Sequence, residues 1–414
     1  MIRVVLDNGL TVIAHRMPVE SETIYVFYNV GAKNEYQGIY GGSHLVEHML
    51  FRRIEGLGKS VDELVEGVGG YFNGFTNYDY TAYVEVLPLE YVDIGFEIES
   101  KRMINAVFDS EEFELERKIV LSEFDMNEND TDTRLLMRAS LVAWDTHPYR
   151  YSIIGLRSDL SSVGRDELYG YYKRFYHPSN ATLVAVGGLD EDAVVKLSER
   201  YFGHIKDGGA SGYVRPWDDG PRSGRYRLDL RAEGGENPRV IFAFKVPGVH
   251  DVEGFRRVVF MDFVLSGDRA FTYGLTAREP MTVPRFSRLY KLVDEGLCNA
   301  VYSYYEPTYM NNLYAVVMYN PRDPDKLVNR LTELILEKPS EEEVRAARER
   351  IESRLTFSLD SPSKAAYIYG LSQLLLGNPM NLILNIESSG QIPPEEYPGF
   401  VEEFIKFSII INYG

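Results

Sequence analysis

Apolar residues follow the same order of strand, turn and helix in two places along the chain. Residues 81–103 (TAYVEVLPLEYVDIGFEIESKRM) start with alternating apolar and polar positions, pass through a turn and continue with apolar residues at helical spacing. Residues 312–336 (NLYAVVMYNPRDPDKLVNRLTELIL) repeat this outline, with a Pro/Asp turn before the helix. An acidic helix start follows each segment after a short gap, at 109–124 and at 339–355. The chain is therefore expected to contain two related units.

The length of 414 residues agrees with two units, because a single hydrophobic core rarely serves more than about 250–300 residues. A stretch at 206–224 is rich in Gly, Pro, Asp and Ser, as linkers are. The predicted division is a first domain at 1–210, a linker at 211–224 and a second domain at 225–414. The predicted fold class is α+β, with two similar α/β domains that each hold a mostly antiparallel sheet covered by helices.

Turn residues predict further local elements. Asn8-Gly9 separates two β-rich runs and predicts an N-terminal hairpin. Residues 69–86 are expected to form a strand pair after two glycines, and residues 299–309 a half-buried strand. Residues 127–133 (NENDTDT) are polar throughout, which predicts a solvated loop.

Composition and charge narrow the possible functions. A formal net charge of −18 argues against a nucleic acid as the partner, because phosphate binding needs clusters of Lys and Arg. No apolar stretch approaches the roughly 20 residues of a membrane-spanning helix, so no membrane is expected as a partner. The N-terminal residues lack the zones of a secretion signal, which favours a cytoplasmic protein. Cys298 is the single cysteine, so any metal must take nitrogen and oxygen ligands.

The segment GGSHLVEHMLF, residues 41–51, places two histidines and a glutamate within five positions. On a helix, His44 and His48 are one turn apart and point the same way, with Glu47 beside them. Ser43 is expected to cap this helix. Two imidazoles at this spacing can bind one Zn²⁺ ion, and the glutamate between them is better placed to take a proton from water than to act as a third ligand. The alternative is a histidine pair that binds no metal.

A catalytic zinc site needs a third protein ligand from elsewhere in the chain. Glu116 and Glu123 are seven residues apart in the acidic helix that follows the first repeat, so they share one helix face. Leu115, Ile119 and Val120 are expected to bury this helix and carry the carboxylates toward the interior. Buried glutamates are costly unless they are paired or bound to a metal. The alternative is a solvent-facing charged stripe, and spacing does not distinguish the two.

The remaining histidines lack spacing partners and are expected to be structural. They are His15, His147, His177, His204 and His250. Of the seven histidines only His250 lies in the second half, which favours a single metal site per chain.

The H-x-x-E-H segment is the inverted zincin motif, and its surroundings resemble the pitrilysin-type (inverzincin) metallopeptidases, which include mitochondrial processing peptidase. The similarity covers most of the first half, in the segments LDNGLTVI, VGAKNEYQGIYGGSHLVEHMLFRR, GGYFNGFTNYDYTAY, ERKIVLSEF and RFYHPSNATLVAVGGLD. The resemblance implies that His44, His48 and Glu123 bind one zinc ion, with Glu47 as general base and Glu116 as a supporting catalytic carboxylate. It also implies that the chain forms half of a clamshell.

The resemblance implies hydrolysis of peptides or small unfolded proteins. In the family a strand binds substrate as an added β-strand, and Asn73 matches the asparagine that contacts the peptide backbone. The alternative for Asn73 is a turn residue. The sequence departs from the family at Gly74, where alanine is usual.

Family members commonly carry an arginine and a tyrosine seven residues apart in the second half, which help to hold substrate over the zinc. The matching positions here are Leu292 and Asn299. A dimer is expected, because this chain supplies two of the four domains of the clamshell. The missing pair favours a heterodimer with a related subunit that supplies the Arg/Tyr clamp over a homodimer. Alternatives to a peptidase are a non-catalytic scaffold or core subunit of a larger complex, and a metal storage or sensor protein.

Overall fold

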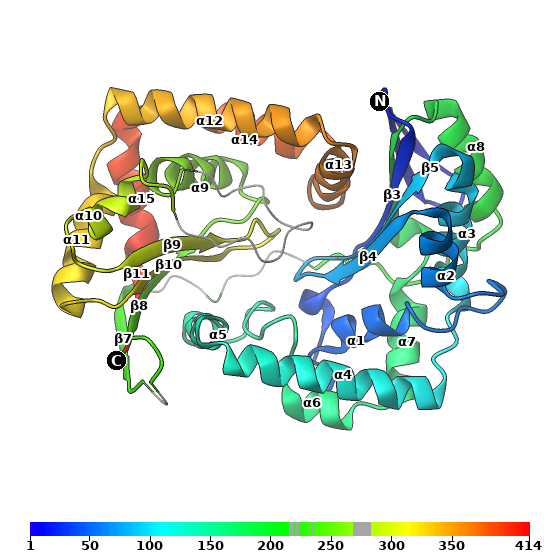
Figure 1. Cartoon of the computed structure of the whole chain (residues 1–414), viewed down its shortest axis with the longest axis horizontal. Helices are drawn as coiled ribbons and strands as arrows, with labels where there is room; N and C mark the ends of the chain where they lie inside the picture. Colours follow the sequence, from blue (N-terminus) through cyan, green and yellow to red (C-terminus); the bar gives the residue numbers. More distant parts are fainter. Residues whose placement is uncertain (215–218, 220–222, 233–234, 268–282) are drawn as a thin grey trace. The chain divides into compact units, whose positions relative to one another are not determined.

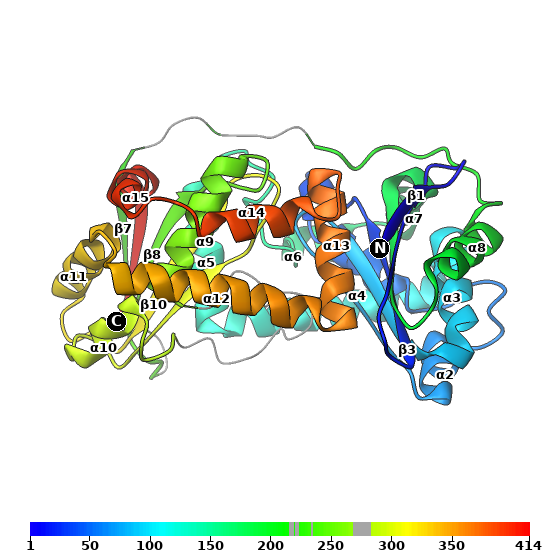
Figure 2. The ribbon, with the colours of Figure 1, turned by 90° about the horizontal axis from the view of Figure 1, so that it is seen from above.

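The chain divides into two compact units in the computed structural model (Figures 1 and 2). The structure describes residues 1–214, 219, 223–232, 235–267 and 283–414. The first unit comprises Met1–Met126, Tyr151–Arg215 and Ser358–Asn381, and the second comprises Asn127–Arg150, Pro216–Phe357 and Leu382–Gly414. Each unit is built on one sheet.

The first sheet has six strands in the order β1-β2-β6-β3-β5-β4, and only β2 and β6 pair in parallel. The strands are β1 (Ile2–Val5), β2 (Thr11–Arg16), β3 (Ser21–Tyr28), β4 (Tyr71–Thr76), β5 (Thr81–Pro88) and β6 (Ala181–Gly187). The predicted hairpin at Asn8-Gly9 and the predicted strand pair within 69–86 are both confirmed. Strand β4 lies at an edge of this sheet, so one side of its backbone pairs with no other strand among the described residues.

Helices cover this sheet and carry the candidate site. Those with most of their residues in the first unit are α1 (Gly42–Met49), α2 (Val61–Val65), α3 (Val92–Asn105), α4 (Ser110–Asn129), α6 (Arg157–Ser162), α7 (Arg165–Phe175), α8 (Glu191–Phe202) and α13 (Pro362–Leu376).

Strand β3 is buried along nearly its whole length because helices pack on both faces of the sheet. Phe27 faces α13, where a Cβ at Gly370 would lie 2.1 Å from its ring. Ile24, three positions earlier and therefore on the opposite face, faces α3, where a Cβ at Gly95 would lie 2.7 Å from its Cδ1 atom. Side chains of a strand alternate between faces, so one strand contributes to two packed layers.

The second sheet has five strands in the order β7-β11-β8-β10-β9, and only β7 and β11 pair in parallel. The strands are β7 (Gly224–Leu230), β8 (Arg239–Val246), β9 (Ala300–Tyr305), β10 (Asn312–Tyr319) and β11 (Phe407–Tyr413). The helices are α5 (Thr131–Ala143), α9 (Val252–Leu265), α10 (Lys291–Asp294), α11 (Pro324–Leu336), α12 (Glu341–Leu359), α14 (Asn381–Ser389) and α15 (Tyr397–Ile405).

Helix α5 packs on the second sheet. Leu135 and Ala139 belong to one buried cluster with Ile241 and Ala243 of β8. The residue between them, Phe242, is equally buried but lies outside this cluster, as strand alternation requires.

The predicted fold class is confirmed: both units are mostly antiparallel sheets with helices. The predicted repeat is also confirmed, since β5, α3 and α4 follow one another as β10, α11 and α12 do. The first sheet takes its strands from 1–210 and the second from 224–413. Helix α5 packs on the second sheet and α13 on the first, so each unit includes a helix from the other half of the sequence.

The prediction of a solvated loop at 127–133 is wrong. Helix α4 continues to Asn129 and α5 starts at Thr131, with Asp130 as the N-cap that accepts a hydrogen bond from the Thr133 N–H group. Asn, Asp and Thr are cap residues as well as loop residues, so the composition of this stretch fits either structure.

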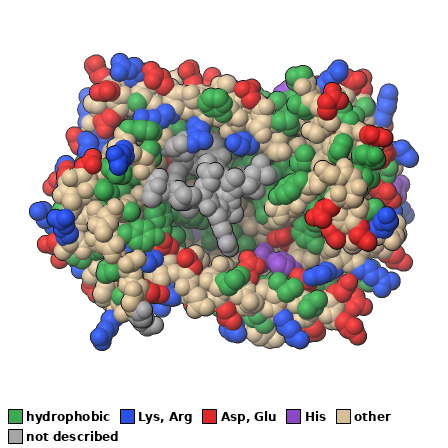
Figure 3. Space-filling view, in the orientation of Figure 1, with side chains coloured by type: hydrophobic (Ala, Val, Ile, Leu, Met, Phe, Trp, Pro, Cys, Tyr) green, Lys and Arg blue, Asp and Glu red, His purple; other side chains and the backbone are tan. Residues whose placement is uncertain are grey.

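Part of the predicted linker, at 215–218 and 220–222, lies outside the described residues. Among the helices that the structure describes, none combines the length and the apolarity needed to cross a membrane. Figure 3 shows acidic and basic side chains interspersed over one face of the molecule, so the excess of negative charge is not gathered into a single patch there.

Candidate metal centre

Helix α1, which carries both histidines of the motif, begins at Gly42. Gly41 precedes it with φ of 94°, in the left-handed region that favours glycine. A Cβ at Gly41 would also lie 2.5 Å from the carbonyl oxygen of Ile154. The Glu35 carboxylate accepts hydrogen bonds from the N–H groups of Gly41 (2.8 Å) and Ser43 (2.7 Å), so this side chain caps the helix.

The prediction that Ser43 caps α1 is wrong. Ser43 is the second residue of the helix, and its N–H group is one of the donors that need a cap. Its hydroxyl group instead forms a 2.9 Å hydrogen bond with the Tyr171 hydroxyl.

Burial raises the pKa of Glu35 to about 8, although its hydrogen bonds with Gly41 and Ser43 oppose this shift.

The structure brings together His44, His48 and Glu123. The Nε2 atoms of both histidines lie 3.7 Å from Oε2 of Glu123. The three ligand atoms all lie within 4.8 Å of one another, and this is the one such group of three potential metal ligands in the described part of the chain. Helix α1 supplies two of these side chains at a spacing of four residues, and α4 supplies the third.

This donor set fits zinc. Two nitrogen ligands at about 2.0–2.1 Å and a carboxylate oxygen at about 2.0–2.2 Å form a tetrahedron whose donors are about 3.4 Å apart. The observed separations of 3.7 Å between each imidazole and Glu123 are close to that value. Three protein ligands leave the fourth position of a tetrahedral ion open, which is the arrangement of a catalytic site.

Glu116 lies behind His48 and is 2% exposed. Its Oε2 atom lies 2.9 Å from His48 Nδ1, and its Oε1 atom accepts a hydrogen bond of 2.5 Å from Arg52 Nε. A carboxylate that accepts a hydrogen bond from the Nδ1–H group keeps the proton on Nδ1 and leaves the Nε2 lone pair of the imidazole available to a metal. No such partner exists for His44, whose buried Nδ1 atom makes no hydrogen bond to the residues described.

Glu47 lies beside the three ligands and is 6% exposed. Its Oε2 atom lies 3.9 Å from Nε2 of His44 and accepts a 3.0 Å hydrogen bond from the Thr76 hydroxyl group of strand β4. Burial raises the pKa of Glu47 to about 7, although His48 and the hydrogen bond from Thr76 lower it. A carboxylate with this pKa can both accept and release a proton near neutral pH.

The two histidines of the site have pKa shifts in opposite directions, and so do the carboxyl groups of Glu47 and Glu116. Burial, helped by His48, lowers the pKa of His44 to about 3, so this imidazole is neutral at physiological pH. Burial also lowers the pKa of His48, but the hydrogen bond with Glu116 and three nearby carboxylates outweigh burial and raise it. For Glu116 burial raises the pKa, and the hydrogen bonds from His48 and Arg52 outweigh this effect and lower it.

The prediction that Leu115 and Ile119 bury helix α4 is wrong, because they are 50% and 40% exposed. The buried side chains are those of Glu116 and Val120, as well as Phe113. Positions three or four residues apart share a helix face, whereas 115 and 119 each lie one residue before a buried position and point about 100° away. The carboxylate of Glu116 therefore faces inward on the same stripe as Phe113 and Val120.

Asn73 lies on the edge strand β4, with its side chain exposed. Its Oδ1 atom accepts a 2.9 Å hydrogen bond from the N–H group of Gly74. A Cβ at Gly74 would lie 2.7 Å from Cζ of Phe51 and 3.1 Å from Cδ1 of Tyr83. The packing of Phe51 against this strand therefore explains why glycine occupies the position.

Sequence reasoning missed three residues that support the site: Arg52, Thr76 and Glu35. Arg52 follows His48 by four residues, so its helical spacing was a usable signal. Thr76 and Glu35 reach the site through the fold of β4 and of the segment before α1, and no local pattern marks either residue.

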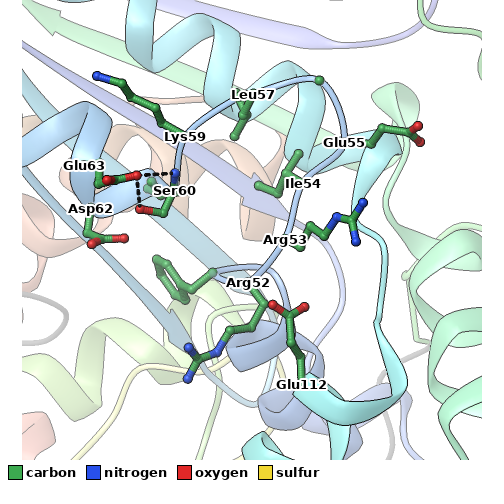
Figure 4. A pocket seen from close by; sticks show the side chains of 14 residues that line it. Arg52, Arg53, Ile54, Glu55, Leu57, Lys59, Ser60, Asp62, Glu63 and Glu112 are labelled. Atoms are coloured by element: carbon green, nitrogen blue, oxygen red, sulfur yellow. Dashed lines mark hydrogen bonds between the residues drawn. The ribbon is translucent and has the colours of Figure 1, made fainter.

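A polar hollow of about 580 Å³ lies next to the site and is lined by residues 51–63 and Glu112 (Figure 4). Arg52 and Glu112 lie on one side of it, and Lys59 and Glu63 on another. Ser60 and Glu63 form a capping box at the start of α2. Arg52 is thus a side chain that lines the hollow and also contacts Glu116.

Two models of protein families match the sequence. Residues 10–156 match the model described as "Insulinase (Peptidase family M16)", and residues 162–351 match "Peptidase M16 inactive domain". The chain is 25% identical to an "Uncharacterized zinc protease" of Rickettsia felis over 98% of this chain and 92% of that protein. It is 26% identical to the mitochondrial-processing peptidase subunit beta of Caenorhabditis elegans, over 59% of this chain and 52% of that protein.

Solved structures share the fold. A protease from Helicobacter pylori aligns with a TM-score of 0.87 and 21% identity, covering 99% of this chain and 98% of that one. The periplasmic protease PqqL of Escherichia coli aligns with a TM-score of 0.77 and 18% identity, covering all of this chain but 47% of that one. The two family models together span most of the sequence, and the metal-ligand cluster lies in the part that matches the first of them. This chain belongs to peptidase family M16.

Proposed function

We propose that the chain is a zinc metallopeptidase that hydrolyses peptides or small unfolded proteins. The observation that carries the proposal is the convergence of His44, His48 and Glu123, with the carboxylate of Glu47 beside them. The name of the Rickettsia felis relative, a zinc protease, supports it. In this proposal one zinc ion is bound per chain.

A zinc ion held by the three ligands would act as a Lewis acid, which lowers the pKa of water toward about 7 and polarises a peptide carbonyl group. Glu47 accepts a proton from the attacking water and later donates it to the leaving amine. Thr76 donates a hydrogen bond to Glu47 and holds its carboxylate toward the ligands. Glu116 orients His48 through the Nδ1 atom, and acts in catalysis only through that ligand.

The substrate is proposed to bind along β4 as an added strand. In the part of the chain that the structure describes, no strand pairs with the outer side of this edge strand. Main-chain hydrogen bonds to such an edge hold a peptide independently of its sequence. Thr76 links the end of the strand to Glu47, so a peptide on β4 would lie next to the catalytic carboxylate. Asn73 is exposed on the same strand and is the proposed contact to the peptide backbone.

In this proposal, residues 1–210 are the catalytic domain, and residues 225–414, joined through a linker at 211–224, are a related non-catalytic domain. The match of residues 162–351 to the model named as inactive supports the second role.

The active form is proposed to be a dimer, with a heterodimer favoured over a homodimer. PqqL is more than twice as long as the part that this chain covers, and the C. elegans relative is named as a subunit. Leu292 is apolar and fully buried, so it cannot replace the arginine expected of the family, and Asn299 lacks the phenol group of the expected tyrosine. A related subunit would supply that pair. Full activity of the purified single chain, with no gain from a copurified partner, would contradict the heterodimer.

A non-catalytic scaffold or core subunit is the second candidate, because the fold also aligns with a chain of "Complex III2 from Candida albicans" (TM-score 0.79, 12% identity). The two candidates differ in what zinc does. Elemental analysis of the purified protein and a quenched fluorescent peptide assay, each with and without a chelator, separate them. The peptidase proposal predicts one zinc per chain and cleavage that the chelator abolishes and added zinc restores. Bound zinc without cleavage, alone or with the copurified partner, would favour the scaffold.

A further inference from the structure

A hydrogen-bonded turn follows helix α1 directly. Helix α1 ends at Met49, and the next turn is held by hydrogen bonds from the Phe51 N–H to the His48 carbonyl (3.2 Å) and from the Arg52 N–H to the Met49 carbonyl (3.1 Å). This turn places Arg52 one helical turn beyond His48 and on the same side. Its guanidinium group reaches Glu116 from there.

Each oxygen of the Glu116 carboxylate has its own partner. Oε1 accepts a 2.5 Å hydrogen bond from Nε of Arg52 and also forms an ion pair with its Nη2 atom. Oε2 is left for Nδ1 of His48, at 2.9 Å. A rigid guanidinium plane that donates one hydrogen bond to an oxygen and adds an ion pair from a second nitrogen restricts the carboxylate more than a single contact would.

Glu116 needs such a partner because it is almost fully buried. A buried carboxylate is stable only when paired and hydrogen-bonded, and the imidazole of His48, in the neutral form that binds a metal, supplies one donor and no full charge. Arg52 supplies the missing positive charge at Oε1 while its own side chain stays 39% exposed. The cation therefore keeps much of its hydration while it neutralises a desolvated anion.

We propose that Arg52 is a positioning residue of the metal centre. It holds Glu116 so that Oε2 accepts the Nδ1 proton of His48, which directs the Nε2 lone pair of His48 toward the space shared with His44 and Glu123. The inference rests on the proposed function, because it assigns a role within that metal site. The role falls on one ligand only, since Nδ1 of His44 has no hydrogen-bond partner among the described residues.

Zinc affinity measured by competition with a chromophoric chelator is the first test. Arg52→Met is expected to weaken zinc binding by roughly 10- to 100-fold, the usual effect of losing an outer partner of a ligand. Arg52→Lys is expected to fall between wild type and Arg52→Met, because an ammonium group keeps the charge but not the fork of donors. Arg53→Met is the matched control: Arg53 is the adjacent arginine, is exposed, and its side chain makes none of the described hydrogen bonds or ion pairs.

A double-mutant cycle tests whether Arg52 acts through Glu116. Glu116→Gln is expected to weaken zinc binding, and adding Arg52→Met to that variant is expected to change the affinity by less than about twofold. Additive losses would overturn the proposal, because Arg52 would then act by another route. An Arg52→Met affinity within about twofold of wild type would also overturn it.

The tautomer of His48 gives a readout that needs neither zinc nor substrate. In metal-free protein labelled with ¹⁵N-histidine, neutral His48 of the wild type and of Arg53→Met is expected to carry its proton on Nδ1. Arg52→Met, or Arg52→Lys if the first variant does not fold, is expected to give a mixture of tautomers. An unchanged tautomer in a folded Arg52 variant would contradict the proposal. A wild type that binds zinc and cleaves no peptide would instead sink the proposed function and leave this result standing.

Discussion

Glu116 and His48 are 68 residues apart in the sequence, and a 2.9 Å contact between Oε2 and Nδ1 joins them. Through this contact helix α4 orients a proposed metal ligand on α1, and two turns further along the same helix Glu123 approaches the Nε2 atoms of both histidines. One face of one helix thus supplies both a proposed metal ligand, Glu123, and the carboxylate that contacts a second proposed ligand, His48. The site depends on the register between these two helices.

Glu47→Gln is expected to keep zinc and lose hydrolysis. Glutamine has nearly the same shape and can still contact Thr76, but it cannot accept the proton of water. Loss of a general base lowers kcat by roughly 10²- to 10⁴-fold. Elemental analysis and the quenched peptide assay check both parts, with Glu55→Gln, an exposed glutamate that lines the nearby hollow, as the control. Full activity of Glu47→Gln would remove Glu47 from its assigned role.

Gly41→Ala is expected to destabilise the protein more than Gly38→Ala. Both glycines have positive φ, at 94° and 102°, so both substitutions add the strain of a left-handed alanine, about 1–2 kcal/mol. Only at Gly41 would the new Cβ also meet a backbone atom, the Ile154 oxygen at 2.5 Å, whereas nothing lies within 4 Å at Gly38. Overpacking adds about 1–3 kcal/mol. Urea unfolding of both variants checks the order, and equal losses would mean that the backbone moves away at little cost.

Gly370→Ala and Gly170→Ala are expected to change stability in opposite directions. Both glycines lie within helices, where alanine is favoured by about 1 kcal/mol. A Cβ at Gly370 would lie 2.1 Å from the fully buried ring of Phe27, and the resulting overpacking of about 1–3 kcal/mol exceeds the gain in helix propensity. At Gly170 nothing lies within 4 Å. Thermal unfolding should rank Gly170→Ala above wild type and Gly370→Ala below it; a stabilised Gly370→Ala would show that α13 packs less tightly on β3.

The metal-free protein is expected to lose stability as the pH rises from about 5 to about 8. Burial raises the pKa of Glu22 and of Glu47 to about 7 and that of Glu35 to about 8, from an ordinary value of 4.5. The folded state therefore holds protons that the unfolded chain releases above pH 4.5. The contribution of these three carboxyl groups to the free energy of unfolding is fully present below pH 4.5 and is lost as the pH rises through their pKa values in the folded state, about 7 to about 8.

His44 opposes this trend only below its ordinary value of 6.5, since the folded imidazole, with a pKa of about 3, does not take up the proton that the unfolded chain binds. Urea unfolding of the metal-free protein across this range measures the slope, and Glu35→Gln is expected to flatten it. Stability that rises between pH 6.5 and 8 would contradict the assignment of these carboxyl groups as buried and protonated.

The helix with His44 and His48 could be predicted because the spacing of four residues is local information, and the repeat of strand, turn and helix was readable for the same reason. The cap of that helix could not be predicted, because the turn at Gly41 brings the capping residue, Glu35, to the start of the helix. Thr76 contacts Glu47 across 29 residues, and only the pairing of β4 with β5 fixes its place.

The buried face of α4 was misjudged for another physical reason. Apolar side chains usually mark the buried face of a helix, but here the buried stripe holds Glu116 between Phe113 and Val120. His48 and Arg52 compensate the charge of Glu116. The exposed Leu115 and Ile119 then gave a misleading apolar signal.

The most direct test of the metal centre is a crystal structure of the zinc-loaded protein with anomalous scattering recorded at the zinc absorption edge. The account predicts one anomalous peak about 2.0–2.2 Å from Nε2 of His44, Nε2 of His48 and a carboxylate oxygen of Glu123, with Glu47 near but not bound. Zinc bound elsewhere, or no peak at this place with Glu123 turned toward solvent, would contradict it.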